Sequence, residues 1–354
     1  MADRVLIDVM DARYRDAGTK ARNDVRDILN GLGFQTTVMF NRSHGNALRL
    51  LEVLRATGRM GRGVGAGELV VLQYPYHPQI MALMGRRMDA LRKKRGCRYV
   101  ILIHDVLYLR DEGLHHADAA QQQAREVGFF NQADALIVHN AVMRDRLAAD
   151  GVTRPMVCLG LFDYLYDGPA ARQPEDGKTH VVFAGNLTKK NKSGFLRELP
   201  DISDVVFELY GDAPQGLPSA CHYNGSYPPD ALIAHLNGHY GLVWDGPSAE
   251  TCAGNYGAYL RYNDPHKLSL YLAAGLPVAV WRESALAHFV MEQGIGVCVS
   301  SLAELADLPR AGSAAYAALR AQVEQLAPQL RSGQCLQAVI QGVRERLDKG
   351  AAAE

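Results

Sequence analysis

Residues 180–187 read His-Val-Val-Phe-Ala-Gly-Asn-Leu, a short apolar run that ends in a Gly-Asn turn. An apolar run of this length, bounded by turn residues, is typical of a buried β-strand. The residues before it, 166–178, are polar and contain several Gly and Pro, as linkers do. The sequence therefore predicts that one domain ends near residue 165 and that a second begins near residue 179.

On both sides of this stretch, apolar runs of strand length alternate with segments of helical periodicity. This alternation is the pattern of βαβ units, and it predicts an α/β fold with two doubly wound, Rossmann-like domains. In the first domain the predicted strands are residues 4–9, 34–39, 69–73, 99–103, 135–138 and 156–159, and the predicted helices are 19–32, 47–56, 80–94, 121–131 and 142–149. In the second, strands are predicted at 180–183, 205–209, 241–244, 277–280 and 296–299, and helices at 229–236, 265–274, 285–293 and 314–326.

The predicted domain organisation has four parts. Residues 1–165 form an N-terminal domain, 166–178 a linker and 179–330 a C-terminal domain. Residues 331–354 contain an amphipathic segment that is expected to form a helix crossing back to the first domain. Two such domains that face each other would bring the carboxyl ends of both sheets to one cleft. Open α/β sheets bind ligands at those ends, so the site is expected in the cleft.

The composition restricts the class of partner. The chain has 354 residues with 38 basic and 38 acidic side chains, and this balance argues against nucleic-acid binding. Six scattered cysteines without a C-x-x-C pair suggest free thiols in a reducing compartment. With no signal-peptide pattern and no apolar stretch long enough to span a bilayer, a cytoplasmic protein is expected. The basic segment 86–95 has two interpretations, a solvated helix face or a peripheral contact with anionic lipid at the inner face of the membrane.

The strongest local signal is the segment 263–267, Asn-Asp-Pro-His-Lys. Asp264 or Asn263 is a candidate N-cap, Pro265 suits the first helical position, and Gly275 suits a left-handed exit from the helix. The N-terminus of a helix has free N–H groups and partial positive charge, to which Lys267 adds a full charge, so a diphosphate site is predicted. The alternative is a solvated lysine on an ordinary surface helix.

Two other loops are candidate ligand sites. After strand 180–183 come Asn186 and then three lysines at 189, 190 and 192, which would suit a phosphate or sugar. The alternative there is a basic loop that binds nothing. Small residues at 17–19 would let a ligand approach the backbone, although an N-cap at Thr19 explains them as well.

His104 and Asp105 follow the predicted strand 99–103 and are the candidate catalytic residues. A partly buried His or Asp at the end of a strand can act as general base toward an acceptor hydroxyl. Adjacent residues in an extended chain point in opposite directions, so one of them at most faces the reacting atoms, and the alternative is that Asp105 braces the next turn. No D-x-D or H-E-x-x-H motif is present, so neither a metal ion nor another cofactor is expected.

Together these motifs resemble the bacterial glucosyltransferase 3 family, which includes proteins described as β-1,6-galactofuranosyltransferases. The resemblance rests on residues 263–278, 183–187, 103–105, 160–164 and 20–24 and spans nearly the whole chain. It implies a GT-B fold, a UDP-sugar as donor substrate, and transfer of a hexose such as glucose or galactofuranose to a glycan or glycoconjugate acceptor by a homo-oligomer.

The resemblance also implies the residues of the donor site. Lys267, Asn263 and His266 would hold the diphosphate, and Tyr210 would lie beside the uridine. The remaining implied contacts are Asn186 and Lys189 near the phosphates, and Ala17, Gly18 and Thr19 on the other domain. Retaining GT-B enzymes commonly have a ribose-binding glutamate at the position that is Leu270 here, so this departure leaves the stereochemistry of transfer open.

Two other functions are alternatives to a transferase. One is a catalytically inactive GT-B protein that binds or stabilises another glycosyltransferase, and it would release no UDP from any donor. The other is a nicotinamide oxidoreductase, which needs a glycine fingerprint between a first strand and its helix. Neither predicted domain has that fingerprint.

Overall fold

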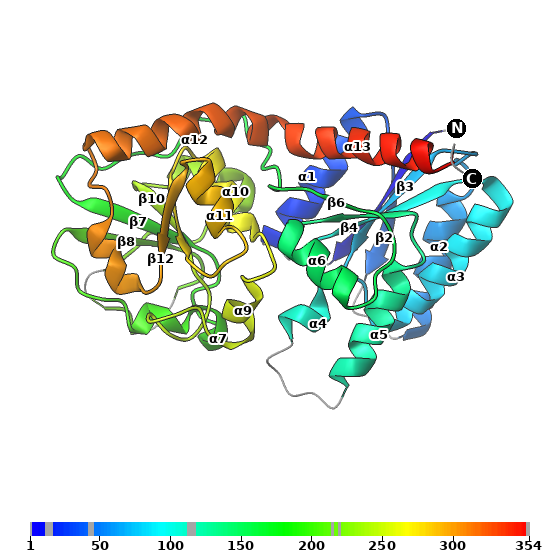
Figure 1. Ribbon diagram of the computed structural model, residues 1–354, viewed down its shortest axis with the longest axis horizontal. Coiled ribbons are helices and arrows are strands. Elements are labelled where there is room, and N and C mark those ends of the chain that lie inside the picture. The colour runs from blue at the N-terminus through cyan, green and yellow to red at the C-terminus, as the bar shows by residue number, and fades with distance from the viewer. Residues whose placement is uncertain are drawn as a thin grey trace. The chain divides into compact units, whose positions relative to one another are not determined.

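The computed structural model describes residues 2–10, 17–41, 46–111, 118–213, 216–218 and 221–351. The chain forms two compact units (Figure 1). The N-terminal unit comprises Met1–Tyr108, His115–Gly160 and Cys335–Glu354, and the C-terminal unit comprises Leu109–Leu114 and Leu161–Gln334. Each unit contains a six-stranded parallel sheet, which confirms the prediction of two doubly wound α/β domains.

The sheet of the N-terminal unit has the strand order β2-β1-β3-β4-β5-β6. The chain moves outward from β1 to β2 and then returns to place β3 on the other side of β1, so the topological switch point lies between β1 and β3. The elements are β1 (Arg4–Met10), α1 (Ala17–Gly31), β2 (Gln35–Asn41), α2 (Asn46–Met60), β3 (Leu69–Tyr74), α3 (Pro78–Arg95), β4 (Arg98–Ile103), α4 (Leu107–Arg110), α5 (Ala119–Phe130), β5 (Ala135–Val138), α6 (Ala141–Ala149) and β6 (Met156–Cys158).

The C-terminal unit repeats this plan with the order β12-β11-β10-β7-β8-β9. Its switch point lies between β7 and β10, which pair directly in the sheet. The elements are β7 (Thr179–Ala184), α7 (Lys190–Ser193), η1 (Gly194–Arg197), β8 (Val205–Tyr210), β9 (Cys221–Tyr223), α8 (Pro229–His235), β10 (Tyr240–Val243), α9 (Gly254–Tyr259), α10 (His266–Ala273), β11 (Val278–Trp281), α11 (Ala287–Glu292), β12 (Gly296–Val299), η2 (Leu302–Asp307) and α12 (Ala314–Ser332).

The last helix, α13 (Gln334–Ala351), follows α12 after a left-handed Gly333. Its side chains contact the N-terminal unit: Arg344 binds Asp3, and Arg98 binds Asp348 at 2.6 Å. The segment between β6 and β7 packs instead on the C-terminal unit, where the Arg172 amide donates to the Leu236 carbonyl at 2.9 Å. Helix α13 therefore belongs to the N-terminal unit, and the segment after β6 belongs to the C-terminal unit.

Short elements account for most differences from the predicted pattern. The sequence did not predict β9 or the helices α4, α7 and α9, all six residues or fewer. Too few residues are present in such elements for a hydrophobic period to show. Helix α12 also runs to Ser332, beyond the predicted end at 326, although it contains Pro328.

All six cysteines are free thiols, of which Cys97 and Cys252 are buried and the other four are partly exposed. Among the described residues, no helix is both long and apolar enough to span a membrane.

Candidate functional site

The switch point of the C-terminal unit gathers three elements around one buried lysine. Lys267 lies in the first turn of α10, and its ammonium lies 4.7 Å from the centre of the Phe183 ring at the end of β7. The same ammonium donates to the Asp245 carboxylate at 2.7 Å and to the Trp244 carbonyl at 3.2 Å, both just beyond β10. Lys267 therefore lies at the position in this sheet where open α/β folds bind ligands.

The Lys267–Asp245 ion pair is almost completely withdrawn from solvent. The Lys267 and Asp245 side chains are 10% and 8% exposed. Burial lowers the pKa of Lys267 from its ordinary value, while the attraction of Asp245 opposes that shift. Losing either partner would leave a buried, uncompensated charge, which costs about 3–5 kcal/mol.

Asp245 was not among the predicted site residues, and a tight loop holds it in place. The next residue, Gly246, has φ +131°, and a Cβ there would lie 2.6 Å from the Ala253 carbonyl oxygen. The Gly246 amide also donates to the Lys192 carbonyl at 2.7 Å. A side chain at residue 246 would be strained and crowded, so glycine fits where the loop turns away from Asp245.

Lys189 and Lys192 extend the positive charge around this loop. Both ammonium groups lie over the ring of Tyr256 on α9, at 4.4 Å and 5.3 Å from its centre, and Lys189 also bonds the Tyr256 hydroxyl. Lys192 is close enough to Lys267 to lower its pKa by repulsion. Asn186 caps the turn that leads to Lys189, because its Oδ1 accepts from the Lys189 amide at 2.7 Å.

The start of α10 differs by one residue from the prediction. Pro265 is the N-cap residue, with an extended ψ of 137°, and makes no side-chain capping bond, so the helix begins at His266. The prediction that Pro265 occupies the first helical position after a capping Asp264 or Asn263 was therefore wrong. The predicted left-handed exit at Gly275 is confirmed by its φ of +82°.

Asn263 and His266 flank Lys267 in different ways. The Asn263 Oδ1 atom is buried and has no hydrogen-bond partner in the described part of the chain. The His266 Nε2–H group donates to the Asp163 carbonyl at 3.2 Å, and the ring stacks on Tyr164 with centroids 5.1 Å apart. His266 thus contacts the segment after β6, while Asn263 has an unused acceptor.

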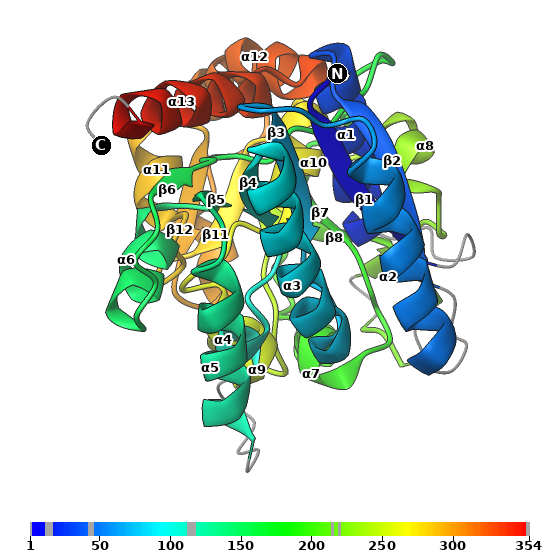
Figure 2. The same ribbon diagram turned by 90° about the vertical axis from the view of Figure 1, so that its right-hand side faces the viewer.

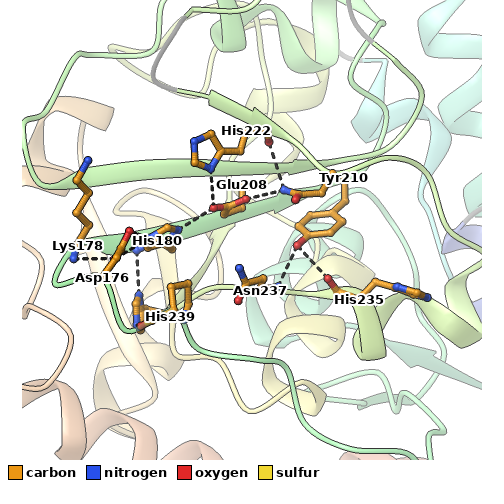
Figure 3. A network of polar contacts seen from close by, with 11 residues as sticks. Asp176, Lys178, His180, Glu208, Tyr210, His222, His235, Asn237 and His239 are labelled. Atoms are coloured by element: carbon orange, nitrogen blue, oxygen red, sulfur yellow. Dashed lines mark hydrogen bonds and ion pairs between the residues drawn. The ribbon is translucent and has the colours of Figure 1, made fainter.

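Tyr210, at the end of β8, belongs to the polar network in Figure 3. Its hydroxyl donates to the His235 carbonyl at 3.0 Å and accepts from the Asn237 amide at 2.9 Å. The side chain is buried, and burial raises its pKa to about 12. Both hydrogen bonds of the Tyr210 hydroxyl join it to backbone groups of the C-terminal unit. Contact between Tyr210 and a uridine stays a prediction.

The same network contains a buried carboxylate, Glu208. It accepts from His180 Nδ1 at 2.7 Å, from His222 Nδ1 at 3.2 Å and from the Asn224 amide at 2.6 Å. Burial opposes ionisation of both Glu208 and His180, yet their hydrogen bonds outweigh it, lowering the pKa of Glu208 and raising that of His180. Asp176, on the other ring nitrogen of His180, adds to that rise.

Replacing Glu208 by Gln is expected to destabilise the C-terminal unit in a pH-dependent way. Because the pKa of His180 is raised in the folded state, His180 contributes stability that is complete below pH 6.5 and is lost as the pH rises through the folded value. Because the pKa of Glu208 is lowered, Glu208 contributes stability above pH 4.5. The variant should therefore lose about 1.5–3 kcal/mol near pH 5–6 and clearly less near pH 9. Denaturant melts at the two pH values measure this, and an equal loss at both would contradict the assignment.

In the N-terminal unit, His104 is oriented by a buried glutamine. His104 Nε2 lies 2.8 Å from Gln73 Oε1, while Gln73 Nε2 donates to the Arg22 carbonyl at 3.1 Å. Because the amide nitrogen of Gln73 is used by Arg22, its oxygen faces the histidine and must accept. His104 therefore carries its proton on Nε2, and in the neutral ring Nδ1 is the proton acceptor.

The segment after Asp105 is fixed by Glu126 on α5. Its carboxylate accepts from the Leu107 and Tyr108 amides at 3.0 Å and 3.1 Å, at the start of α4. Burial raises the pKa of Glu126 to about 7, although these bonds and those from Gln122 and Tyr74 favour the ionised form. Sequence reasoning missed both Gln73 as the partner of His104 and Glu126 as the brace of this turn.

Ala17, Gly18 and Thr19 form the first turn of α1. Thr19 is inside the helix, so the interpretation of Thr19 as N-cap was wrong. These three residues, with His104 and Asp105, belong to the N-terminal unit, whereas the other predicted donor-site residues belong to the C-terminal unit.

Solved structures with the same architecture define the fold. A sucrose-phosphate synthase from Thermosynechococcus elongatus superposes with a TM-score of 0.63 at 12% identity, covering 99% of this chain and all of that one. An α,α-trehalose-phosphate synthase (UDP-forming) from Burkholderia vietnamiensis superposes with a TM-score of 0.54 at 13% identity, covering both chains completely. The predicted GT-B fold, with its two Rossmann-like domains, is confirmed.

Sequence comparison then places the chain within that fold class. The models for the N-terminal and C-terminal domains of glucosyltransferase 3-like proteins match residues 4–161 and 181–343, so the chain belongs to the glucosyltransferase 3-like family. The β-1,6-galactofuranosyltransferase WbbI of Escherichia coli K12 is 29% identical over 83% of this chain and 84% of its own. Glucosyltransferase 3 of Streptococcus gordonii is 28% identical over 80% of each chain.

Proposed function

We propose that this protein is a glycosyltransferase that moves a hexose from a UDP-sugar to a hydroxyl group of a glycan or glycoconjugate acceptor. The observation that carries the proposal is the position of Lys267, at the switch point between β7 and β10 and at the N-terminus of α10. Its relatives named as galactofuranosyltransferase and glucosyltransferase support glucose or galactofuranose as the transferred sugar.

The charges around Lys267 suit a diphosphate leaving group. Lys189 and Lys192 lie over the Tyr256 ring, and Lys267, which pairs with Asp245, is close enough to Lys192 for the two charges to repel each other. When UDP leaves, the bond to the sugar breaks with both electrons on the β-phosphate oxygen. Fixed cations and helix N–H groups stabilise that charge, and the lysines do so in this proposal without a metal ion.

Asn263 is better suited to a hydroxyl group than to a phosphate. Its buried Oδ1 is an acceptor with no partner in the described residues, and phosphate oxygens at neutral pH mostly accept hydrogen bonds themselves. We therefore assign Asn263 to a hydroxyl of the ribose or of the transferred sugar. The ribose needs such a partner, because the position expected for a glutamate is the buried Leu270.

On the acceptor side, the hydrogen bond to Gln73 favours His104 over Asp105 as general base. A base held in one tautomer by a third group is the arrangement that activates nucleophiles in many enzymes. In an inverting reaction, His104 Nδ1 would take the proton of the acceptor hydroxyl while the hydroxyl oxygen forms its bond to the anomeric carbon. This role predicts a neutral His104 in the active enzyme.

Thermal-shift measurements with UDP, GDP and TDP test the donor assignment. A ligand at one hundred times its dissociation constant stabilises the folded state by about 2.7 kcal/mol. For compact domains of about 150–250 residues, that stabilisation corresponds to an increase in melting temperature of about 5–10 °C. We expect this increase with UDP and a clearly smaller one with GDP or TDP; no shift with UDP would contradict the proposed donor.

A further inference from the structure

The outer surface of α2 exposes four leucines. Leu48, Leu50, Leu51 and Leu54 are between 39% and 53% exposed, whereas Val53, Ala56, Thr57 and Met60 of the same helix are fully buried. Single exposed leucines are ordinary, but four within seven residues of one helix make a contiguous apolar patch. A patch of this kind marks an interaction surface.

Helix α3 lies beside α2 in the N-terminal unit (Figure 2), and the two helices are joined where Arg87 donates to the Thr57 hydroxyl at 3.2 Å. Leu50, Leu54 and Thr57 follow one another at helical spacing of four and three residues, so this leucine row runs along the side of α2 that meets α3. The exposed leucines therefore lie on a helix that packs directly against α3.

The two helices carry a large excess of positive charge. Together they contain nine Lys and Arg residues and two acidic residues, Glu52 and Asp89, a net charge of +7 in a chain whose overall charge is zero. Arg86, Lys93 and Lys94 are exposed, and Arg86 and Lys93 are two helical turns apart on one stripe. We propose that the α2–α3 face, defined by residues 46–60 and 78–95, docks on an anionic lipid surface.

Charge decides between a membrane and a second copy of this chain. A two-fold symmetric contact brings the same patch of both copies together, so it would oppose the exposed Arg86, Lys93 and Lys94 of each copy, and like charges across an interface are unfavourable. An anionic bilayer offers negative headgroups to the cations and an acyl boundary to the leucines. Leucines with adjacent Lys and Arg are the composition of helices that lie in a membrane interface.

The proposal is tested by sedimenting the full chain with vesicles of phosphatidylcholine, with and without phosphatidylglycerol. We expect binding to vesicles that contain phosphatidylglycerol, weakened by added salt, and little binding to phosphatidylcholine alone. The double variants Leu51→Glu/Leu54→Glu and Lys93→Glu/Lys94→Glu should each lower the partition coefficient at least about tenfold. Failure of the wild-type chain to bind anionic vesicles would overturn the proposal.

Two control variants make the same kinds of substitution at exposed positions outside α2 and α3. Val142→Glu/Met291→Glu alters two exposed apolar residues, and Lys178→Glu/Lys349→Glu reverses two exposed cations. Both controls should bind like the wild type, and vesicle binding that fell equally in them would refute a specific face. If the leucine variant instead converted an oligomer to a monomer while the wild type ignored anionic vesicles, the face would be an interface between copies. Neither readout depends on transferase activity.

Discussion

Replacing Lys267 by Ala is expected to lower kcat/KM by about two to three orders of magnitude, the loss seen when one group that stabilises developing charge is removed. The variant also leaves the Asp245 carboxylate buried without its partner, so its melting temperature should fall as well. Steady-state assays of UDP release, together with thermal melts, measure both effects.

A second variant separates catalysis from folding. Lys267→Met with Asp245→Asn removes both charges at similar side-chain volume, and such neutral replacements are often tolerated. We expect the double variant to regain stability but to stay about a hundredfold or more below wild-type turnover. Lys190→Ala, at an exposed lysine in the same basic segment, is the matched control and should remain near wild type. Near-normal transfer by the double variant would contradict the role of Lys267.

Replacing His104 by Ala is expected to lower kcat by about 10²–10⁴-fold, the usual contribution of a general base. The affinity for UDP should change little, because the diphosphate residues belong to the other unit. Asp105→Asn should lose much less activity. A severe loss in Asp105→Asn with a mild one in His104→Ala would reverse the assignment, and mild losses in both would point to a mechanism without a protein base at this position.

The orienting role of Gln73 has its own signature. Gln73→Glu would place a carboxylate beside His104 Nε2–H, favouring the protonated imidazolium and raising the pKa of His104. Since the base must be neutral, the acidic limb of the kcat pH profile should move to higher pH. Gln73→Leu should lower kcat without that displacement, and identical profiles for the two variants would contradict the assignment.

Local sequence patterns predicted the elements that carry the site. Helix α10 was predicted to within one residue at its start, because Pro fixes φ near the helix start and Gly readily adopts the left-handed conformation at its end. Strand β7, predicted at residues 180–183, was likewise evident from its apolar run and the Gly-Asn turn. Such short-range patterns predict where a helix or strand lies without knowledge of the tertiary fold.

Pairings over long distances in the chain could not be predicted in the same way. Asp245 and Lys267 are joined by packing between the end of β10 and α10, and the Gln73–His104 bond depends on the register in which Tyr74 pairs with Ile103. One signal for Asp245 was present, since an acidic residue directly follows the apolar run 240–244 and precedes a glycine. A charged residue at the carboxyl end of a buried strand is a candidate site residue, because open α/β sheets bind ligands at that end.

Titration calorimetry with UDP tests the central claim, that the switch point around Lys267 is the donor site. The wild-type chain should bind one UDP. Lys267→Met/Asp245→Asn should bind it about ten- to a hundredfold more weakly, because a hydrogen bond to a charged group contributes about that factor to the affinity. Equal affinity of the two proteins for UDP would show that the diphosphate lies elsewhere.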